Sequence, residues 1–308
     1  MADNEYDREV EFLIIGAGSA GCTLANRLSA DKDNRVLVLE AGPMDTGLDS
    51  WKIHMPTAFA YPLKDDKYNW FYHSQPEPYL GDRVIHCPRG RVLGGSSSIN
   101  GMVYIRGHAF DYDKWAQKGC KGWAYRDVLP YFRRAESLDT GADDYHGGDG
   151  PLKVTSGTIE SNPLFRAFID ASVEAGYAES MDLNGVRQEG VGRMDRTTHN
   201  GKRRSAAVSF LKPVMDRPNL SVEVRALTNR VLFDGKKAVG VAYEQGGKTF
   251  KVHATREVIL SSGSINSPQL LQLSGVGNAG ELQALGIDVV HNLPGVGENL
   301  QDHLEVFV

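Results

Sequence analysis

The residues best suited to bind a phosphate group lie near the N-terminus, in the sequence Gly16-Ala-Gly-Ser-Ala-Gly21. Glycines with this spacing permit a tight turn and let the backbone approach a pyrophosphate closely. Glu40 ends the next apolar run, where a carboxylate accepts hydrogen bonds from ribose hydroxyls and disfavours a 2′-phosphate. The pattern therefore predicts a dinucleotide site. Its expected contacts are Gly16, Gly18, Ser19, Ala20, Gly21, Glu40 and Ala41.

A second stretch of similar chemical character runs from Gly90 to Tyr104 and holds four glycines and three consecutive serines. Neighbouring N–H and hydroxyl groups in such a segment donate hydrogen bonds to an anion, and its glycines let the backbone come close to a ligand. A plain surface loop of glycine and serine is the alternative for this stretch taken alone.

The elements that position the first glycine turn follow from hydrophobic periodicity. The apolar run Val10–Ile15, the turn itself and a helical stretch over 22–30 predict a strand, a tight turn and a helix. A second buried strand is predicted over 35–40. The next fifty residues, rich in aromatic residues and proline, are predicted to be an irregular connection that interrupts the parallel arrangement.

The second half of the chain predicts a change of strand pattern. From Ser221 the residues alternate, and Asp234-Gly235 marks a hairpin, so we expect an antiparallel meander that includes 221–225. A buried strand over 257–260, a small-residue turn and a helix follow. A meander placed between parallel strands favours a flavin-binding domain over a nicotinamide-binding one.

Three further segments are predicted to be helical. One runs from about Asp127 to Ser137, and a second is capped by Asn162 and stopped by Gly176, with an apolar face that predicts a core helix. A third begins at Arg203, and we expect its basic start to be a solvated face rather than a phosphate clamp. The turn-forming segment 143–151 predicts a domain boundary.

The composition narrows the class of protein. A chain of 308 residues with 41% hydrophobic content and a net charge of −5 is predicted to be globular, with no nucleic-acid partner. The three cysteines, Cys22, Cys87 and Cys120, fit no metal or redox spacing and predict reduced thiols. The acidic N-terminus shows no targeting segment, so we expect a cytoplasmic protein; peripheral association with a membrane stays open.

Several motifs identify a family by resemblance. Gly90-Arg-Val-Leu-Gly-Gly-Ser-Ser-Ser-Ile-Asn100 resembles the first signature of the glucose–methanol–choline (GMC) flavin oxidoreductases, and 263–277 resembles the second. The segments 143–151 and 295–303 also match the family, and 68–70, 75–78, 100–107 and 226–235 are similar to its choline-oxidising members. The resemblance implies a Rossmann-like α/β fold with an antiparallel meander and part of an α+β substrate-binding domain.

The resemblance also implies the cofactor and its contacts. FAD is expected to be noncovalent, because Ile99 stands where some members carry a histidine bonded to the flavin. Trp70 matches a tryptophan of the choline-oxidising members and is a candidate for the substrate's cationic group. Beyond the first glycine turn, the implied FAD contacts are Val92, Gly95, Ser96, Asn100, Gly101, Met102, Val103, Thr228 and Gly263.

The implied activity is oxidation of choline or another primary alcohol by hydride transfer to flavin N5. No catalytic residue is assigned, because the family's catalytic histidine and its partner are expected beyond Val308. The alternatives are a noncatalytic FAD-binding fragment, a lyase of the same family, and an NAD dehydrogenase. The electron acceptor and the oligomeric state are left open.

The expected domain plan alternates between two domains. Residues 1–150 and 201–303 are assigned to the FAD-binding domain, 151–200 to a segment of the substrate domain, and 304–308 to the start of a further substrate-domain segment in a longer protein.

Overall fold

The computed structural model describes residues 6–157 and 162–303, and its largest element is a six-stranded sheet. The chain divides into two compact units. The first comprises the described parts of Met1–Leu48, Tyr61–Ile99 and Ala206–Val308, and the second comprises Asp49–Ala60 and the described parts of Asn100–Ser205. The predicted segment 304–308 lies outside the described residues.

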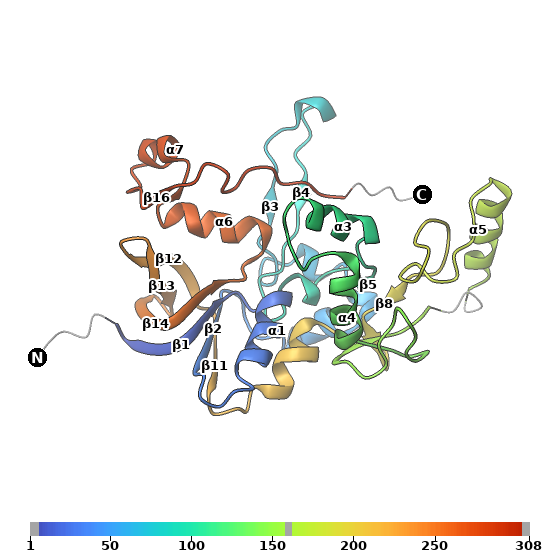
Figure 1. Ribbon diagram of the computed structural model, residues 1–308, viewed down its shortest axis with the longest axis horizontal. Helices are drawn as coiled ribbons and strands as arrows, with labels where there is room; N and C mark the ends of the chain where they lie inside the picture. The colour runs from blue at the N-terminus through green and yellow to red at the C-terminus, as the bar shows by residue number, and fades with distance from the viewer. Residues whose placement is uncertain (1–5, 158–161, 304–308) are drawn as a thin grey trace, which may run out of the picture. The chain divides into compact units, whose positions relative to one another are not determined.

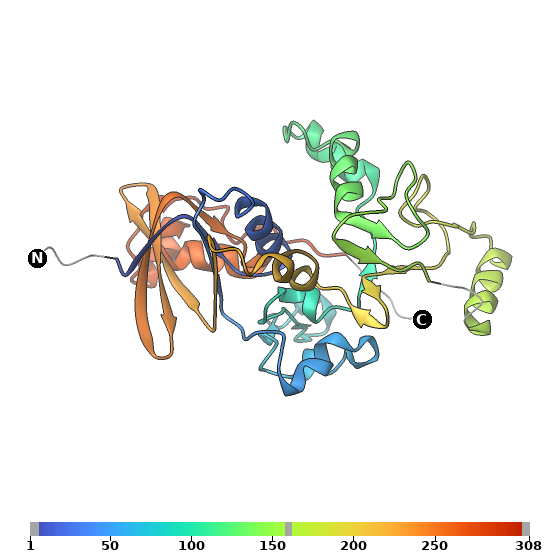
Figure 2. The same ribbon diagram turned by 90° about the horizontal axis from the view of Figure 1, so that it is seen from below.

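The sheet belongs to the first unit and joins strands from both ends of the chain (Figures 1 and 2). Four neighbouring strands run parallel, and β14 then continues into an antiparallel meander with β13 and β12. The order is β11 (Leu220–Val224), β2 (Val36–Glu40), β1 (Arg8–Ile15), β14 (Lys248–Leu260), β13 (Lys237–Gln245) and β12 (Leu227–Asp234).

The core of the first unit lies on the central strands of this sheet. Leu13, Leu37 and Val241 are fully buried there, and all five residues of β2 are buried. Such continuous burial is typical of a strand with both faces covered, which explains the apolar runs in the sequence. The predicted α/β fold with a meander is confirmed.

One strand of the predicted meander is placed differently. β11 pairs in parallel with β2 at the edge of the sheet, with Val222 opposite Val38, so it does not belong to the meander. An alternating pattern reports only that one face is buried and does not distinguish a parallel partner from an antiparallel one. The hairpin at Asp234-Gly235 is confirmed, because β12 and β13 pair on either side of it.

Helices and short strands complete the first unit. The helix predicted over 22–30 begins earlier, as α1 (Ser19–Leu28), and the helix after β14 is α6 (Gly263–Leu273). The other elements are 3₁₀ turns η3 (Pro62–Lys64), η4 (Pro78–Leu80), η5 (Gly95–Ser98) and η8 (Lys212–Val214), the π-helix η7 (Ala207–Leu211), α7 (Ala279–Ala284), and the strand pairs β3 (Tyr72–His73) with β4 (His86–Cys87) and β15 (Val276–Gly277) with β16 (His291–Asn292).

The second unit consists of short strand pairs and helices. The predicted helix near 127–137 is present as α4 (Tyr125–Ala135). The other elements are η1 (Leu48–Ser50) at the border of the units, α2 (Trp51–His54), η2 (Pro56–Ala58), α3 (Ala109–Gln117), α5 (Pro163–Glu174), and the pairs β5 (Val103–Tyr104) with β8 (Asp195–Arg196), β6 (Glu136–Leu138) with β7 (Leu152–Val154), and β9 (Thr198–His199) with β10 (Lys202–Arg203).

The second unit contains a charged cluster in which Arg106, Glu136 and His146 are buried. The Glu136 carboxylate accepts hydrogen bonds from Arg106 Nη2 at 2.9 Å and from the Gly147 N–H at 2.9 Å, and it contacts His146 Nδ1 at 3.0 Å. His146 Nε2 lies 3.0 Å from Asp182 Oδ2. Asp182 and Glu136, in that order, raise the pKa of His146 to about 10, so the imidazole is a second cation in this cluster.

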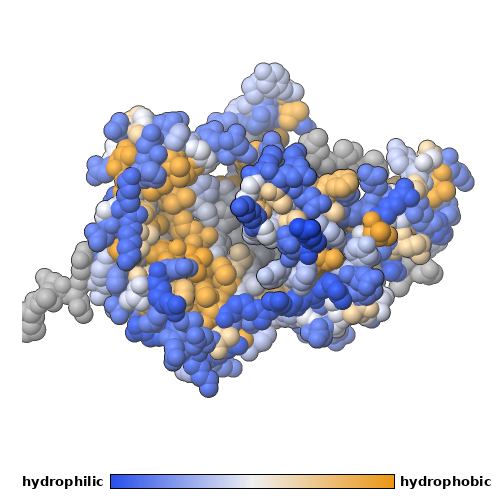
Figure 3. Space-filling model, viewed as in Figure 1, coloured by the Kyte–Doolittle hydropathy of each residue, from blue (hydrophilic) through white to orange (hydrophobic). Residues whose placement is uncertain are grey.

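Two predictions about helices in this part of the chain are wrong. α5 is capped by the Asn162 side chain as expected, but among its residues only Ile169 is buried, and Leu164 and Phe168 are exposed. Hydrophobic surface is accordingly visible at the right of the molecule, where Figure 1 places α5 (Figure 3). α5 is therefore not a core helix of the described structure. Arg203 lies in strand β10 and is only 1% exposed, so it does not belong to a solvated helix face.

The compact units do not share the predicted boundaries at 150 and 200. The chain passes between units after Leu48, Ala60, Ile99 and Ser205. The crossing at 99/100 comes earlier than predicted because α4 and β6 pack with β7 inside the second unit. The assignment of these units to cofactor and substrate domains stays a proposal.

Candidate cofactor site

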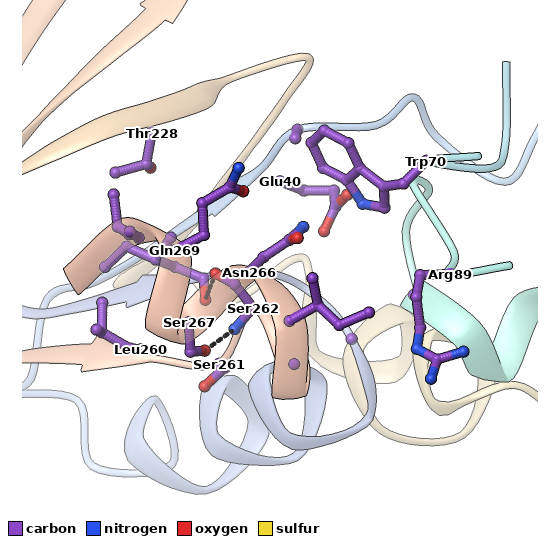
Figure 4. A pocket seen from close by; sticks show the side chains of 18 of the residues that line it. Glu40, Trp70, Arg89, Thr228, Leu260, Ser261, Ser262, Asn266, Ser267 and Gln269 are labelled. Carbon is purple, nitrogen blue, oxygen red and sulfur yellow. Dashed lines mark hydrogen bonds between the residues drawn. The ribbon is translucent and has the colours of Figure 1, made fainter. Parts of the chain in front are cut away.

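A cavity of about 990 Å³ opens in the first unit where the parallel strands end. Ile15 ends β1, Glu40 ends β2, and Leu260 ends β14, and all three line the cavity. Ligands of open α/β sheets bind outside the carboxyl ends of the strands, so the cavity lies where the fold places a binding site. Figure 4 shows α6 residues Asn266 and Gln269 on one side and Trp70 and Arg89 on the other.

The first glycine turn lines this cavity. Gly16 has a φ of +93°, and a Cβ on it would lie 2.7 Å from the Ser261 carbonyl oxygen. A Cβ on Gly21 would lie 1.9 Å from the Gly16 carbonyl oxygen, so helix α1 could not approach the turn with any other residue there. Both positions therefore require glycine for the fold itself.

The two glycine-rich stretches meet at the cavity. A Cβ on Gly95 would lie 2.8 Å from Gly18 Cα, so the backbones of the two stretches are in close contact. Gly18 itself has open space, since its own Cβ would find no atom nearer than 3.9 Å. Gly90, Gly95 and Ser96 line the cavity together with Gly16 and Gly18, and the Gly90–Tyr104 stretch is therefore not a plain surface loop at these positions.

Two helices present their N-termini to the cavity. Gly18 and Ser19 begin α1, and Ser262 and Gly263 begin α6. Neither helix has an acidic residue in its first turn, and the Ser262 hydroxyl donates to the Ile15 carbonyl at 3.2 Å instead of capping α6. The positive ends of both helix dipoles therefore favour an anion in the cavity.

Glu40 is the charged group at the end of β2. It is 5% exposed, and its two oxygens accept hydrogen bonds from the Ala17 N–H at 2.8 Å and the Gly42 N–H at 2.9 Å. Burial raises the pKa of Glu40 to about 7, against the lowering effect of these two N–H groups. Within the described ranges no Lys, Arg or His forms an ion pair with Glu40, and each oxygen can accept a further hydrogen bond.

An aromatic pair stands beside α6. The Trp70 and Tyr72 rings stack with centroids 5.9 Å apart, and the Tyr72 hydroxyl donates to Asn266 Oδ1 at 2.6 Å. The Arg91 guanidinium lies 5.5 Å from the Trp70 ring centroid. Trp70 thus already contacts a cation of its own chain.

Thr228, a residue of β12 that lines the cavity, has a polar atom without a hydrogen-bond partner in the described structure. Its hydroxyl oxygen is buried and has no hydrogen-bond partner among residues 6–157 and 162–303. Buried polar groups normally have a partner, so this hydroxyl is a group that a ligand could satisfy.

Most of the predicted contacts line the cavity. Gly21 and Val92 are buried and do not line it. Asn100, Gly101, Met102 and Val103 belong to the second unit. The predicted residues in the lining are Gly16, Gly18, Ser19, Ala20, Glu40, Ala41, Trp70, Gly95, Ser96, Thr228 and Gly263.

Several lining residues escaped prediction from the sequence. Leu39 and Leu260 could have been found from the rule that sites lie at the carboxyl ends of parallel strands. Tyr72, Arg89 and Asn266 carried no such signal, because their contacts depend on how distant segments pack. The remaining additions are Ile15, Gly90, Ala226, Leu227, Asn229, Ser261, Ser262, Ser264, Ile265, Ser267, Gln269, Leu270 and Leu273.

The sheet, the glycine turn and the acid at the end of β2 together define a Rossmann-like dinucleotide-binding fold. The chain belongs to the GMC oxidoreductase family, whose sequence profile matches residues 10–305. It is 57% identical to the mitochondrial choline dehydrogenase of Mus musculus over 304 residues, which are 97% of this chain and 51% of that protein. It is 54% identical to the oxygen-dependent choline dehydrogenase of Photobacterium profundum, over 96% of this chain and 52% of that protein.

Solved structures share the fold. Pyridoxine 4-oxidase from Mesorbium loti superimposes with a TM-score of 0.87 at 33% identity, over 92% of this chain and 55% of that one. Formate oxidase superimposes with a TM-score of 0.83 at 28% identity, over 92% and 50%. The chain thus spans about half the length of the relatives it matches. No helix in its described part is both long and apolar enough to cross a bilayer.

Proposed function

We propose that the first unit binds FAD noncovalently in the cavity and that the whole protein oxidises a primary alcohol, choline or a similar molecule, to the aldehyde. The observation that carries the proposal is the convergence of two uncapped helix N-termini, a glycine turn and a buried acid with neutral donors on one cavity. A pyrophosphate suits the helix N-termini, ribose hydroxyls suit Glu40, and the buried Thr228 hydroxyl suits the adenine end.

The bound flavin would supply the hydride acceptor, and the chain's own residues would hold and orient it. Gly16, Gly18 and Gly95 would let the backbone approach the pyrophosphate. Glu40, ionised, would accept hydrogen bonds from a ribose. Asn100 to Val103 and Gly263 are the further contacts that the family resemblance supports.

A titration with three nucleotides tests the cofactor. FAD should quench protein fluorescence with a measurable Kd, whereas FMN, which lacks the adenosine half, should bind at least about tenfold more weakly because it leaves Glu40 without a ribose. NAD is the third ligand, because it contains the same adenosine half as FAD and should bind no more tightly than FAD. Equal affinity for FMN and FAD, or tighter binding of NAD, would contradict the proposal.

The flavin is proposed to be noncovalent, because Ile99 offers no nucleophile. It is 2% exposed, and its side chain is packed as an ordinary core residue. Acid precipitation of the flavin-loaded protein should leave a yellow supernatant and a colourless pellet. A yellow pellet would mean that another residue bonds the flavin.

Residues 1–308 alone are proposed not to oxidise alcohols, since the expected base lies outside them. Anaerobic mixing of the FAD-loaded chain with excess choline should leave the flavin oxidised, and a form that includes the second half found in the relatives should lose its yellow colour. Bleaching of the 1–308 chain would place the base within it.

Trp70 is proposed to help hold the cationic head of the substrate in the whole protein. Cation–π contacts contribute about 0.5–2 kcal/mol. Trp70→Ala should raise KM for choline more than KM for an uncharged alcohol of similar shape. Equal losses on the two substrates would leave Trp70 as a packing partner of Tyr72 and Arg91.

A further inference from the structure

A strained turn lies beside the cavity of the first unit. Phe71 has a φ of +54° although it is not glycine. Residues held in the left-handed region persist only where their surroundings fix them, and they cluster at ligand sites. The neighbours of Phe71 on both sides, Trp70 and Tyr72, line the cavity, so this turn decides how two aromatic side chains meet a ligand there.

Asn69 fixes the base of the turn. It is 2% exposed, and its Oδ1 accepts hydrogen bonds from the Phe71 N–H at 3.1 Å and from the Arg89 N–H at 3.0 Å. Its Nδ2 donates to the Leu63 carbonyl at 2.9 Å, and the Trp70 N–H donates to the Arg89 carbonyl at 3.0 Å. The turn is therefore bound to Arg89, which also lines the cavity, and all of these residues belong to the first unit.

The turn sends its aromatic side chains to two different places. The Phe71 ring stacks on the His86 ring with centroids 5.3 Å apart, and neither residue lines the cavity. The Trp70 and Tyr72 rings stack on each other with an angle of 5° between their planes, and both line the cavity. We call these two rings the aromatic wall.

The Tyr72 hydroxyl joins the aromatic wall to helix α6. It donates to Asn266 Oδ1 at 2.6 Å, and Asn266 lies in the first turn of α6. Burial raises the pKa of Tyr72, so the phenol stays protonated and keeps a hydrogen to donate. Trp70 and the α6 residues lie on different sides of the cavity (Figure 4). The hydrogen bond therefore connects the wall on one side to the helix N-terminus on the other.

We propose that Tyr72 is a positioning residue that holds the aromatic wall against α6 and so slows the escape of FAD from the cavity. The inference rests on the proposed function, because FAD is the ligand of this cavity only through that proposal. Tyr72 acts through its hydrogen bond to Asn266 and through its stack on Trp70, and it is given no part in the proton or hydride transfer.

The rate at which FAD leaves the FAD-loaded protein tests this role without turnover. Tyr72→Phe removes one oxygen and keeps the ring, so the stack on Trp70 remains. Loss of one hydrogen bond between neutral groups should raise the dissociation rate of FAD roughly 2- to 10-fold, with a similar rise in Kd, because changes in affinity are mostly changes in dissociation rate. The recovery of flavin fluorescence after dilution measures this rate.

Tyr79→Phe is the matched control. Tyr79 lies in η4, between β3 and β4 of the same hairpin, and is 98% exposed, so the same loss of a hydroxyl should leave the dissociation rate unchanged. An unchanged rate in Tyr72→Phe would overturn the proposal, and so would an equal rise in Tyr79→Phe.

The empty protein separates positioning of a ligand from ordinary packing. Tyr72 is partly exposed, so water can take the place of Asn266 when no cofactor is bound. The melting temperature of the empty Tyr72→Phe variant should therefore stay close to that of the empty wild type, while the FAD-loaded variant should melt earlier than the FAD-loaded wild type. Equal falls in the two forms would make Tyr72 a packing residue and overturn its role at the cavity.

A variant at Asn266 gives a second, independent arm. Asn266→Leu is of similar size and has no acceptor, so it should also raise the dissociation rate. Tyr72→Phe should add little to that rise, because the two changes remove the same hydrogen bond. Additive effects would show that Tyr72 acts elsewhere, and a wild-type rate in Asn266→Leu would overturn the proposal even if the Tyr72 variant failed to fold.

The two proposals fail in different ways. A wild-type protein that binds no FAD defeats the proposed function. A wild-type protein that binds FAD, together with a Tyr72→Phe variant of unchanged dissociation rate, defeats only the role of Tyr72.

Discussion

Glu40 in the first unit and Glu136 in the second are both buried carboxylates, but the chain surrounds them differently. Glu136 is fully buried and is held by Arg106 and by His146, which are 2% exposed at their side chains. Glu40 is held by two backbone N–H groups and, within the described ranges, by no cation.

The difference separates a structural charge from a charge kept for a ligand. When a buried carboxylate is paired with cations of its own chain, these cations offset the cost of removing it from water. Such a carboxylate has a structural role. A buried carboxylate with neutral donors keeps a raised pKa and unused acceptor capacity, which is typical of a binding site. Five tests can break or sharpen this distinction.

Arg106→Met should have the largest effect. It leaves Glu136 buried with one cation fewer, and breaking a buried pair costs about 3–5 kcal/mol. Urea unfolding monitored by circular dichroism measures the loss. Arg166→Met is the matched control, because Arg166 and its two partners, Asp170 and Glu179, are partly exposed, and each such pair contributes at most about 1 kcal/mol. A loss at Arg106 no larger than the control would mean that Glu136 does not depend on its cations.

Glu40→Ala should weaken FAD binding and leave the fold largely intact. A hydrogen bond to a charged acceptor contributes about 1.5–3 kcal/mol, so the Kd should rise about tenfold or more. Fluorescence titration measures it, with Glu40→Gln as the variant that keeps the shape. Unchanged affinity in both variants would make Glu40 a structural acid like Glu136.

The pH dependence of FAD binding should report the same carboxyl group. Because the pKa of Glu40 in the empty protein is about 7, the group is protonated below that pH and is a poorer acceptor for ribose hydroxyls. Affinity should therefore fall as the pH drops through 7, and Glu40→Gln should show a flatter profile. A profile that is the same in both proteins would assign the titration to another group.

The Glu40 carboxyl group should change the stability of the empty protein with pH in the direction opposite to its effect on FAD binding. Since the pKa of Glu40 is raised from 4.5 to about 7 by burial, the folded empty protein holds this proton more tightly than the unfolded chain does. Stability of the empty protein should fall as pH rises from about 4.5 to 7, and the Glu40→Gln variant should lack this loss.

His146 should have a smaller effect on the stability of the protein, and this effect should be seen at alkaline pH. Its pKa is raised from 6.5 to about 10, so its contribution to stability is complete below 6.5 and is lost as the pH rises through about 10. His146→Asn should flatten the decline in melting temperature across this window. An identical decline in the variant would mean that the charge of His146 does not support Glu136.

The parts of the site that sequence could predict are those that depend on neighbouring residues. The strand, glycine turn, helix and Glu40 lie within one short segment whose periodicity and spacing carry the information. The hydrogen bond between Tyr72 and Asn266 joins residues 194 apart, and no local pattern encodes it. The burial of Arg203 was missed for a related reason, since a basic dipeptide in sequence does not reveal which side chain the second unit encloses.

The position of β1 has a consequence for synthesis of the chain. β1 lies between β2 and β14, and the contacts that join its start to β14 connect residues 244 apart. At roughly 5–20 residues per second, an apolar strand leaves the ribosome on the order of 10–50 s before its second neighbour exists. Pairing of such distant strands is intrinsically slow, so the nascent protein must spend this interval with one edge of β1 uncovered, and it should depend on chaperones more than a protein built from sequential hairpins does.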